Sequence, residues 1–287
     1  MASKMNTKAI PSLFTTRNPI RWQFDSANRR LKAFEPFPGP RLAVDLLRRE
    51  HPKMEKVILY ARPGQETSWK SMGYRREGII QGYFSDRQDC WLWCAYPEPS
   101  RGRPRDAEAL RRVLEIAQAP HAVGQRTLPQ GYTTASVGAA EVAEVTRLLK
   151  TVFPVYPSDL SSETTSRLVA DGSSCFRMVR NAEGECVAVA SAELNRSQLN
   201  AEMTDCATRP DQRGRGLMAY LIRELEMEVA RRFRILDLYS LARGPEAGIN
   251  RVFSRLGYAH AGALINNCRM PTGWETMNLW CKSFVSA

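Results

Sequence analysis

The chain contains 287 residues, of which 43% are apolar, and it carries a formal net charge of +11. This length is comfortable for two domains, and the apolar content is sufficient for packed cores. No uninterrupted apolar stretch is long enough to span a bilayer, and residues 1–14 lack the apolar segment and cleavage pattern of a secretory signal. We therefore expect a soluble, cytoplasmic protein with no membrane partner.

The cysteines and histidines do not form the pattern of a metal site or a disulfide framework. Seven cysteines are scattered along the chain, and only Cys90 and Cys94 lie close together. Three histidines occur far apart, and none has a cysteine pair of metal-ligand spacing beside it. These patterns predict a reducing compartment and no bound metal.

Most of the positive charge lies in the first part of the chain. Residues 1–125 contain 22 Lys and Arg against 13 Asp and Glu, whereas residues 126–287 contain 19 against 17. The densest basic cluster is RGRPR at residues 101–105, and its Gly and Pro content predicts an exposed loop. A basic excess can serve a solvated surface or a nucleic-acid contact, and here we favour the solvated linker.

A pattern in the first half recurs in the second half. Each copy has an apolar strand candidate, an aromatic segment ending in Gly-Tyr, a glycine at the same spacing, and a final Leu-Trp-Cys. The paired segments are residues 57–60 and 236–239, 69–74 and 253–258, Gly78 and Gly262, and 92–94 and 279–281. We interpret this as a duplication in which residues 1–125 form a smaller, degenerate half-domain; chance similarity of aromatic strands is the alternative.

The second half, residues 126–287, is predicted to contain both strands and helices. We expect a strand at residues 132–137, helices at 139–150 and 158–171, and strands at 175–180, 186–192 and 201–208. The sequence NAEG at residues 181–184 is typical of a hairpin turn. After residue 216 we expect a helix, a strand at 235–241, a helix at 247–256, and strands near 261–265 and 275–281.

A glycine-rich turn separates the strand at 201–208 from the amphipathic helix that follows. It consists of Arg213, Gly214, Arg215, Gly216 and Leu217. Glycines allow a tight turn that brings several N–H groups near one anion, and the helix adds its unpaired N-terminal donors. The P-loop and dinucleotide fingerprints are absent, which leaves a pyrophosphate held mainly by backbone donors. Surface turns and nucleic-acid-binding segments use the same residue types.

This turn and its flanking strand resemble those of the GNAT acetyltransferases, and residues 202–216 match in register. The resemblance implies an α/β chain with a mixed, mostly antiparallel sheet flanked by helices, and acetyl-CoA as co-substrate. It places the cofactor on the turn and on the end of the preceding strand. The implied cofactor-binding residues are Cys206, Ala207, Thr208, Arg213, Gly214, Arg215, Gly216, Leu217 and Phe253.

Within that family, the chain resembles the β-lysine N-acetyltransferases more closely. The resemblance rests on residues 153–157, 200–208, 213–217, 256–258, 264–267 and 275–280, with departures at residues 268–271 and at Thr276. It implies transfer of acetyl to the ε-amino group of β-lysine, giving the compatible solute Nε-acetyl-β-lysine used in osmoprotection. Direct transfer in a ternary complex would require no acylated enzyme.

Such a reaction needs a proton acceptor, because an alkyl ammonium has a pKa of about 10.4. Glu202 is our candidate; a structural pairing with an arginine is the alternative. Asp205, three residues on, falls on the opposite strand face unless a bulge intervenes. Many family members place a tyrosine acid where this chain has Phe253, whose ring cannot donate a proton. Backbone donors at residues 206–208 are candidates to polarise the thioester oxygen.

The β-lysine acceptor also requires partners for its carboxylate and for its second amine. Arg269 or Arg243 are candidates for the carboxylate. For the second amine the candidates are Glu275, Asp205 and the pair Asn266 and Asn267, and Tyr156 is a candidate wall for the aliphatic chain. The paired asparagines can instead form a turn after a strand, and Tyr156 can pack near its two prolines.

Two other functions remain open from the sequence. One is N-acetylation of a different diamine or diamino acid. The other is a noncatalytic module that senses CoA or associates with nucleic acid. The basic first half motivates this alternative, and Met218, where the family usually has Gly or Ala, and Phe253 would then mark lost catalysis; we do not expect a nucleic-acid partner.

Overall fold

The computed structural model describes residues 7–9, 21–35, 37, 49, 53–120, 127–154 and 161–285. These residues contain one 13-stranded sheet in the order β1-β2-β3-β4-β6-β5-β12-β13-β11-β10-β9-β8-β7. The first six strands are β1 (Thr7–Ala9), β2 (Arg21–Asp25), β3 (Arg30–Phe34), β4 (Lys56–Ala61), β5 (Arg75–Ile80) and β6 (Cys90–Ala95). The others are β7 (Thr133–Ser136), β8 (Ser174–Arg180), β9 (Cys186–Asn195), β10 (Asn200–Thr208), β11 (Asp237–Arg243), β12 (Ala259–Met270) and β13 (Gly273–Ser283).

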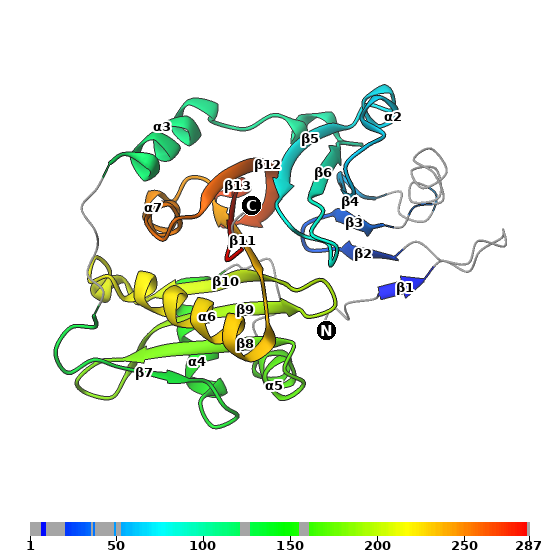
Figure 1. Ribbon diagram of the computed structural model, residues 1–287. Helices are drawn as coiled ribbons and strands as arrows, with labels where there is room; N and C mark the ends of the chain where they lie inside the picture. Colours follow the sequence, from blue (N-terminus) through cyan, green and yellow to red (C-terminus); the bar gives the residue numbers. More distant parts are fainter. Residues whose placement is uncertain are drawn as a thin grey trace.

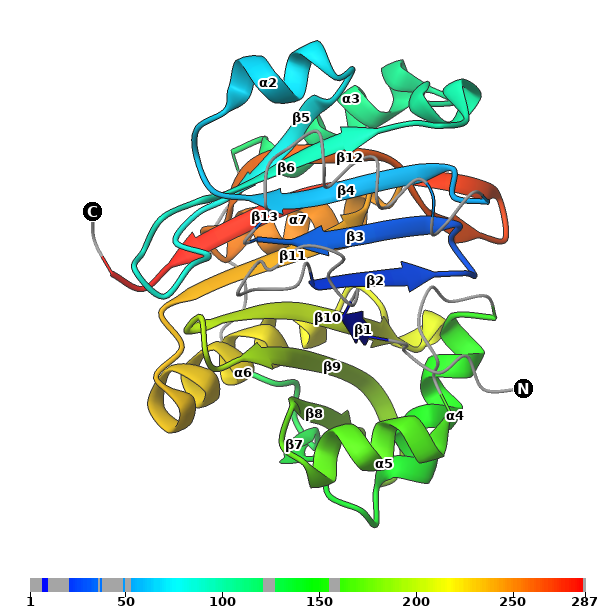
Figure 2. The ribbon, with the colours of Figure 1, turned by 90° about the vertical axis from the view of Figure 1, so that its right-hand side faces the viewer.

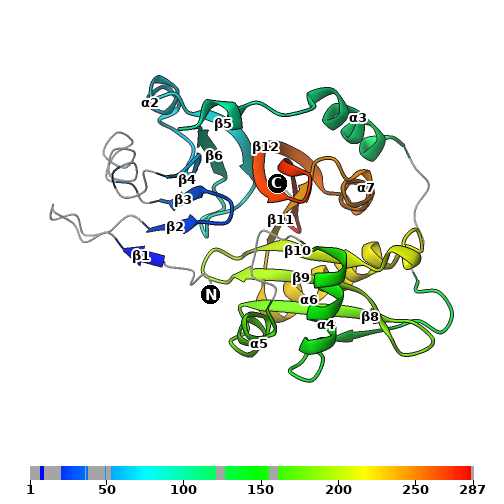
Figure 3. The same ribbon diagram turned by 180° about the vertical axis from the view of Figure 1, so that it is seen from behind.

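Helices cover both faces of the C-terminal part of the sheet. The helices of the described residues are α2 (Glu66–Ser71), α3 (Ala107–Gln118), α4 (Val142–Val152), α5 (Ser162–Ala170), α6 (Leu217–Phe233) and α7 (Ala247–Arg255), with short 3-10 turns η1 (Pro99–Gly102) and η2 (Pro210–Gln212). Among them, α2 packs against the N-terminal strands through Trp69. Figure 1 shows α6 across one face of β8–β10, and Figure 3 shows α4 and α5 over the other. No helix of the described ranges has the length and apolar character needed to cross a bilayer.

The pairing confirms the predicted mixed, mostly antiparallel sheet. Only β3 with β4 and β10 with β11 run parallel among the described strand pairs. The predicted hairpin turn joins β8 to β9, where the N–H of Gly184 donates to the carbonyl of Asn181 at 3.0 Å. The two final strands are longer than predicted, so Asn266 and Asn267 lie within β12 and not in a turn after it.

The strand order is nearly symmetric about the contact between β5 and β12. On one side the order is β5, β6, β4, β3, and on the other it is β12, β13, β11, β10, with the parallel pair at the same place. Register shifts also match, between Arg76 and Gly78 and between His260 and Gly262. This correspondence favours the predicted duplication, and the division of the chain near residue 125 remains our proposal.

The symmetric positions differ where chemistry is expected. The parallel pairing of β10 with β11 ends at Glu202 opposite Tyr239, and that of β3 with β4 ends at Phe34 opposite Tyr60. Phe34 therefore stands where the C-terminal half has its candidate base. A phenyl ring cannot accept a proton, so the N-terminal copy cannot perform the same chemistry.

The predicted exposed loop at residues 101–105 is wrong for its first two residues, because Arg101 and Gly102 are buried. Arg101 is only 2% exposed, and its guanidinium lies 3.6 Å from the ring centroid of Trp274. Its Nε donates to the carbonyl of Asn266 at 3.1 Å, and Arg105 donates to the carbonyl of Thr272. The basic cluster thus clamps the connection between the two halves onto the β12–β13 hairpin, because a guanidinium can serve a ring face and several carbonyls at once.

Candidate active site

The parallel strands β10 and β11 diverge like a fork. They pair only at Asn200–Asp237, Ala201–Leu238 and Glu202–Tyr239, although β10 continues to Thr208 and β11 to Arg243. A bulge in β10 begins after Thr204, and Asp205 adopts a left-handed φ of 50°. Facing strand edges that do not pair leave backbone N–H and C=O groups available to a ligand.

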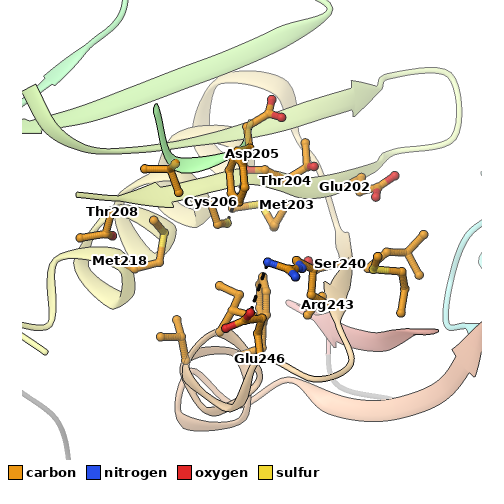
Figure 4. A pocket seen from close by; sticks show the side chains of 18 of the residues that line it. Glu202, Met203, Thr204, Asp205, Cys206, Thr208, Met218, Ser240, Arg243 and Glu246 are labelled. Atoms are coloured by element: carbon orange, nitrogen blue, oxygen red, sulfur yellow. Dashed lines mark hydrogen bonds and ion pairs between the residues drawn. The ribbon is translucent and has the colours of Figure 1, made fainter. Parts of the chain in front are cut away.

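The fork opens into a large central cleft, which we define as the space bounded by strands β2, β3 and β9 to β13 and by helices α4 to α7. Its volume of about 1700 Å³ exceeds the several hundred Å³ of a typical single-ligand pocket. Figure 4 shows Glu202 and Asp205 on β10, with Arg243 and Glu246 across the cleft. The cleft therefore has room for two substrates, one on each side of the fork.

The glycine-rich turn lies at the mouth of the cleft and starts α6. Gly214 and Gly216 adopt left-handed φ values of 78° and 76°, and Gly216 is the N-cap of α6. No side chain in the described part of the chain caps this helix, so the N–H groups of its first turn remain available to an anion. Arg213 and Arg215 are exposed beside the turn. All of the predicted residues from 213 to 217 line the cleft.

Replacing Gly216 by alanine is expected to raise the KM for acetyl-CoA about tenfold with little change in kcat. A left-handed φ costs a non-glycine residue about 1 kcal/mol, and the added methyl group meets no protein atom within 4 Å, so it projects into the open space beside the turn. Steady-state kinetics measures both constants. Gly184→Ala is the matched control, since its φ is 81° and it lies in the hairpin away from the central cleft. An unchanged KM in Gly216→Ala would contradict the assigned phosphate turn.

Not all of the other predicted cofactor-binding residues present their side chains to the cleft. Cys206, Thr208 and Phe253 line the cleft, whereas the side chain of Ala207 is buried in the core beneath α4, which leaves only its backbone for a ligand. Burial raises the pKa of the Cys206 thiol far above its ordinary value, so this thiol stays protonated and is a poor nucleophile. The ring of Phe253 is buried and packs against Tyr258 with centroids 5.0 Å apart.

Three carboxylates gather on the β9–β10 wall of the cleft. Glu193 lies directly opposite Glu202 in the strand register. We expected Asp205 on this face only if a bulge intervened in the strand, and the bulge is present. Asp205 lines the cleft and accepts a hydrogen bond from Ser191 Oγ at 2.7 Å. We call Glu193, Glu202 and Asp205 the acidic wall.

Burial makes Glu202 a stronger base than an ordinary carboxylate. Burial raises the pKa of Glu202, the cations Lys32 and Arg30 and a hydrogen bond from Tyr239 oppose this shift, and Asp205 adds to it. Burial and the neighbouring Glu202 raise the pKa of Glu193 as well. Two neighbouring carboxylates resist simultaneous ionisation, so one of the pair holds a proton more readily than an isolated carboxylate does.

The residues predicted to bind the rest of the acceptor are not gathered in one place. Arg243 lines the cleft, but its guanidinium is held by Glu275 at 2.8 and 2.9 Å and by Glu246 at 3.2 Å. Glu275 does not line the cleft, and its pKa is lowered chiefly through Arg243 and Thr272 against the effect of burial. The carboxylate role proposed for Arg243 and the amine role proposed for Glu275 therefore conflict with their mutual ion pair.

The remaining candidates divide in a similar way. Arg269 is exposed and lies off the cleft, and its backbone N–H donates to Asn28 Oδ1 at 2.7 Å. Asn266 donates its side-chain N–H groups to the carbonyls of Arg101 and Arg103, which is a structural role. Asn267 is fully buried and lines the cleft, and its Oδ1 has no hydrogen-bond partner among the described residues. Tyr156 lies outside the described residues.

Sequence reasoning missed the cations that face the acidic wall. Arg30 and Lys32 of β3 line the same cleft, although they precede Glu202 by about 170 residues. Figure 2 shows how the curled sheet brings β2 and β3 toward β9 and β10. No local pattern indicates such a contact. The position of Glu193, by contrast, could have been predicted, because pairing β9 with β10 outward from the loop that joins them places Glu193 opposite Glu202.

Comparisons with known proteins identify the family of the chain that forms this strand fork and uncapped helix. The model of the GNAT acetyltransferase family matches residues 142–258. A "Beta-lysine N(6)-acetyltransferase" of Methanosarcina mazei is 34% identical, with 80% of this chain and 92% of that protein covered. The chain belongs to the GNAT family and is an acetyltransferase, a family that uses acetyl-CoA.

Two further relatives share most of the length of the chain. The "N-acetyltransferase YodP" of Bacillus subtilis is 30% identical, with 79% of this chain and 82% of that protein covered. A second "Beta-lysine N(6)-acetyltransferase", from Methanococcus maripaludis, is 22% identical, with 80% of this chain and 83% of that protein covered. These alignments extend beyond the segment matched by the family model, so the N-terminal half is a shared part of these proteins.

Proposed function

We propose that the protein transfers the acetyl group of acetyl-CoA to the ε-amino group of β-lysine, giving Nε-acetyl-β-lysine, a compatible solute. The observation that carries the reaction is Glu202, a carboxylate of raised pKa at the apex of the fork. The similarity to two β-lysine N6-acetyltransferases supports the choice of acceptor.

The residues of the fork and turn fit acetyl-CoA. The free N–H groups at the start of α6, with Arg213 and Arg215, would hold the pyrophosphate, and the unpaired edges of β10 and β11 would hold the pantetheine arm. Acetyl-CoA supplies an electrophilic thioester carbonyl. Backbone donors at residues 206–208 lie along the β10 edge and would stabilise the negative charge that develops on its oxygen.

Glu202 performs the proton transfer in this proposal. It accepts a proton from the acceptor ammonium directly or through water, because only the neutral amine has a free electron pair. The amine nitrogen then forms its bond to the acetyl carbon as the carbon–sulfur bond breaks, and the CoA thiolate leaves. The acetylated nitrogen loses its second proton to become an amide. Phe253 cannot donate a proton, so the thiolate is protonated by that substrate proton, by water or by another residue. The protonated thiol of Cys206 agrees with direct transfer in a ternary complex.

A second acceptor class has its own support. The acidic wall would also hold the second ammonium group of a simple diamine or of another diamino acid. The carboxylate partners predicted from sequence do not discriminate among these acceptors, because Arg269 lies off the cleft and Arg243 is engaged by Glu275.

Release of free thiol from acetyl-CoA tests the proposal. The purified protein is assayed with β-lysine, α-lysine and 1,5-diaminopentane, and product masses are recorded. We expect kcat/KM to be at least about tenfold higher for β-lysine than for either of the others, since one well-placed charged contact contributes at least that factor. A preference for the diamine would replace the proposed acceptor, and no release with any amine would remove the amine class.

A further inference from the structure

The N-terminal half places a cation in the central cleft without giving it a partner. Lys32, in the middle of β3, is half-buried and lines the cleft. Within the described ranges, its ammonium group makes no hydrogen bond and no ion pair. A buried or half-buried lysine usually has a carboxylate or carbonyl partner, because an ammonium group loses solvation when it leaves water.

The neighbouring cation is already engaged, which separates the roles of the two side chains. Arg30 lies two residues before Lys32 on the same strand face. Its Nε donates to Asp25 at 2.9 Å, and its Nη1 donates to the carbonyl of Asn267 at 3.2 Å. Arg30 therefore contributes positive charge to the cleft while its donors are used by the protein. Lys32 is the cation with donors to spare.

Across the cleft stands the acidic wall. Burial and the charge of Arg30 lower the pKa of Lys32, while Glu202, Asp25 and Glu193 raise it without contacting it. One side of the space thus attracts ammonium groups and the other attracts a carboxylate. A diamino acid carries groups of both kinds, and in its extended form they are several bonds apart.

We propose that Lys32 binds the carboxylate of the acceptor, so that the degenerate N-terminal half selects diamino acids over simple diamines. The inference rests on the proposed function and adds to it the group that recognises the acid. The reactive amine lies at Glu202 and the second amine lies along the acidic wall. An anion at Lys32 restores the solvation that the ammonium group has lost.

The symmetry of the sheet gives this assignment a structural meaning. β3 occupies the position in the N-terminal half that β10 occupies in the C-terminal half. At the end of its parallel pairing it carries Phe34 in place of a base. The N-terminal half has no glycine-rich turn in its described residues and no proton acceptor at Phe34. Its strand β3 nevertheless faces the cleft. The proposal assigns it a binding role in place of catalysis.

The test compares Lys32→Met with the wild type on two acceptors, β-lysine and 1,5-diaminopentane, using thiol release. We expect kcat/KM for β-lysine to fall about 30-fold, because one charge-assisted contact is lost, while the value for the diamine changes less than about threefold. Lys32→Arg is expected to keep the β-lysine value within about fivefold of wild type. Lys70→Met, an exposed position on α2 away from the cleft, is the control and should change neither value.

The outcomes separate this proposal from the proposed function. Equal losses for both acceptors would show that Lys32 acts only on Glu202 or on the fold, and no loss for either would remove its role; both results overturn the subsite. Wild-type protein that prefers the diamine would instead overturn the proposed function. If Lys32→Met does not fold, the wild-type protein is assayed with β-lysine amide in place of β-lysine. Because the amide lacks the carboxylate, its kcat/KM should be about 30-fold lower than that of β-lysine. Undiminished turnover of the amide would overturn the proposal.

Discussion

Replacing Glu202 by glutamine is expected to lower kcat for amine acetylation by about 10² to 10³. A positioned general base contributes on this order, and glutamine keeps the shape of the side chain while removing its ability to accept a proton. The KM for acetyl-CoA should change little, because the glycine-rich turn is at the other end of β10. Steady-state thiol release under saturating substrates measures this loss.

The pH profile should change in the same variant. A base works only when ionised, and the pKa of Glu202 is raised above its ordinary value, so wild-type kcat/KM should fall as the pH drops through that raised pKa. In Glu202→Gln this acidic limb should be lost. The rise toward alkaline pH should persist, because it comes from deprotonation of the amine itself.

Glu193→Gln is the matched comparison, since Glu193 faces Glu202 across the register but lies away from the fork edge. We expect it to reduce kcat less than about tenfold and to keep an acidic limb. A full loss of activity in Glu193→Gln combined with a normal rate in Glu202→Gln would transfer the role of base to Glu193.

The largest expected effect on stability is at the contact between the two halves. Gly262 has a φ of 145°, and a Cβ there would lie 2.2 Å from the carbonyl oxygen of Glu77 and 2.5 Å from the Cα of Gly78. These are backbone atoms of β5, which cannot move without breaking the only residue pair that joins β5 to β12 in the described residues. Gly262→Val is expected to lower the free energy of unfolding by about 4 kcal/mol or more.

Urea denaturation of both proteins provides this comparison. Gly248→Ala is the control, because Gly248 lies within α7 and an added Cβ would meet no atom within 4 Å. It should be neutral or stabilising by up to about 1 kcal/mol. A change of less than 1 kcal/mol in Gly262→Val would mean that the two halves are not joined tightly at this glycine.

Local patterns in the sequence were sufficient to predict the glycine-rich turn and the elements beside it. The turn at residues 213–217 and the helix that starts at Leu217 are encoded by consecutive residues, and so is the hairpin turn after β8. Each depends on glycine conformations or on helical periodicity, which short segments reveal. The fork itself was not predicted, because nothing local shows where a parallel pairing ends.

The acceptor side could not be predicted in the same way. Lys32 lines the same cleft as Glu202 because of the curvature of the whole sheet, and the engagement of Arg243 by Glu275 depends on how β11 and β13 align. Composition did not predict the burial of Arg101, because an RGRPR segment has the same residues whether its arginines contact water or a tryptophan ring. Long-range packing decides such positions, and a single sequence does not display it.

Fragmentation mass spectrometry of the product from β-lysine and acetyl-CoA tests the central claim most directly. If the terminal amine lies at Glu202 while the carboxylate is held on the opposite wall, the product should carry one acetyl group, on the terminal nitrogen and none on the amine at carbon 3. Acetylation at carbon 3, or unmodified β-lysine after prolonged incubation with active enzyme, would contradict this account of the site.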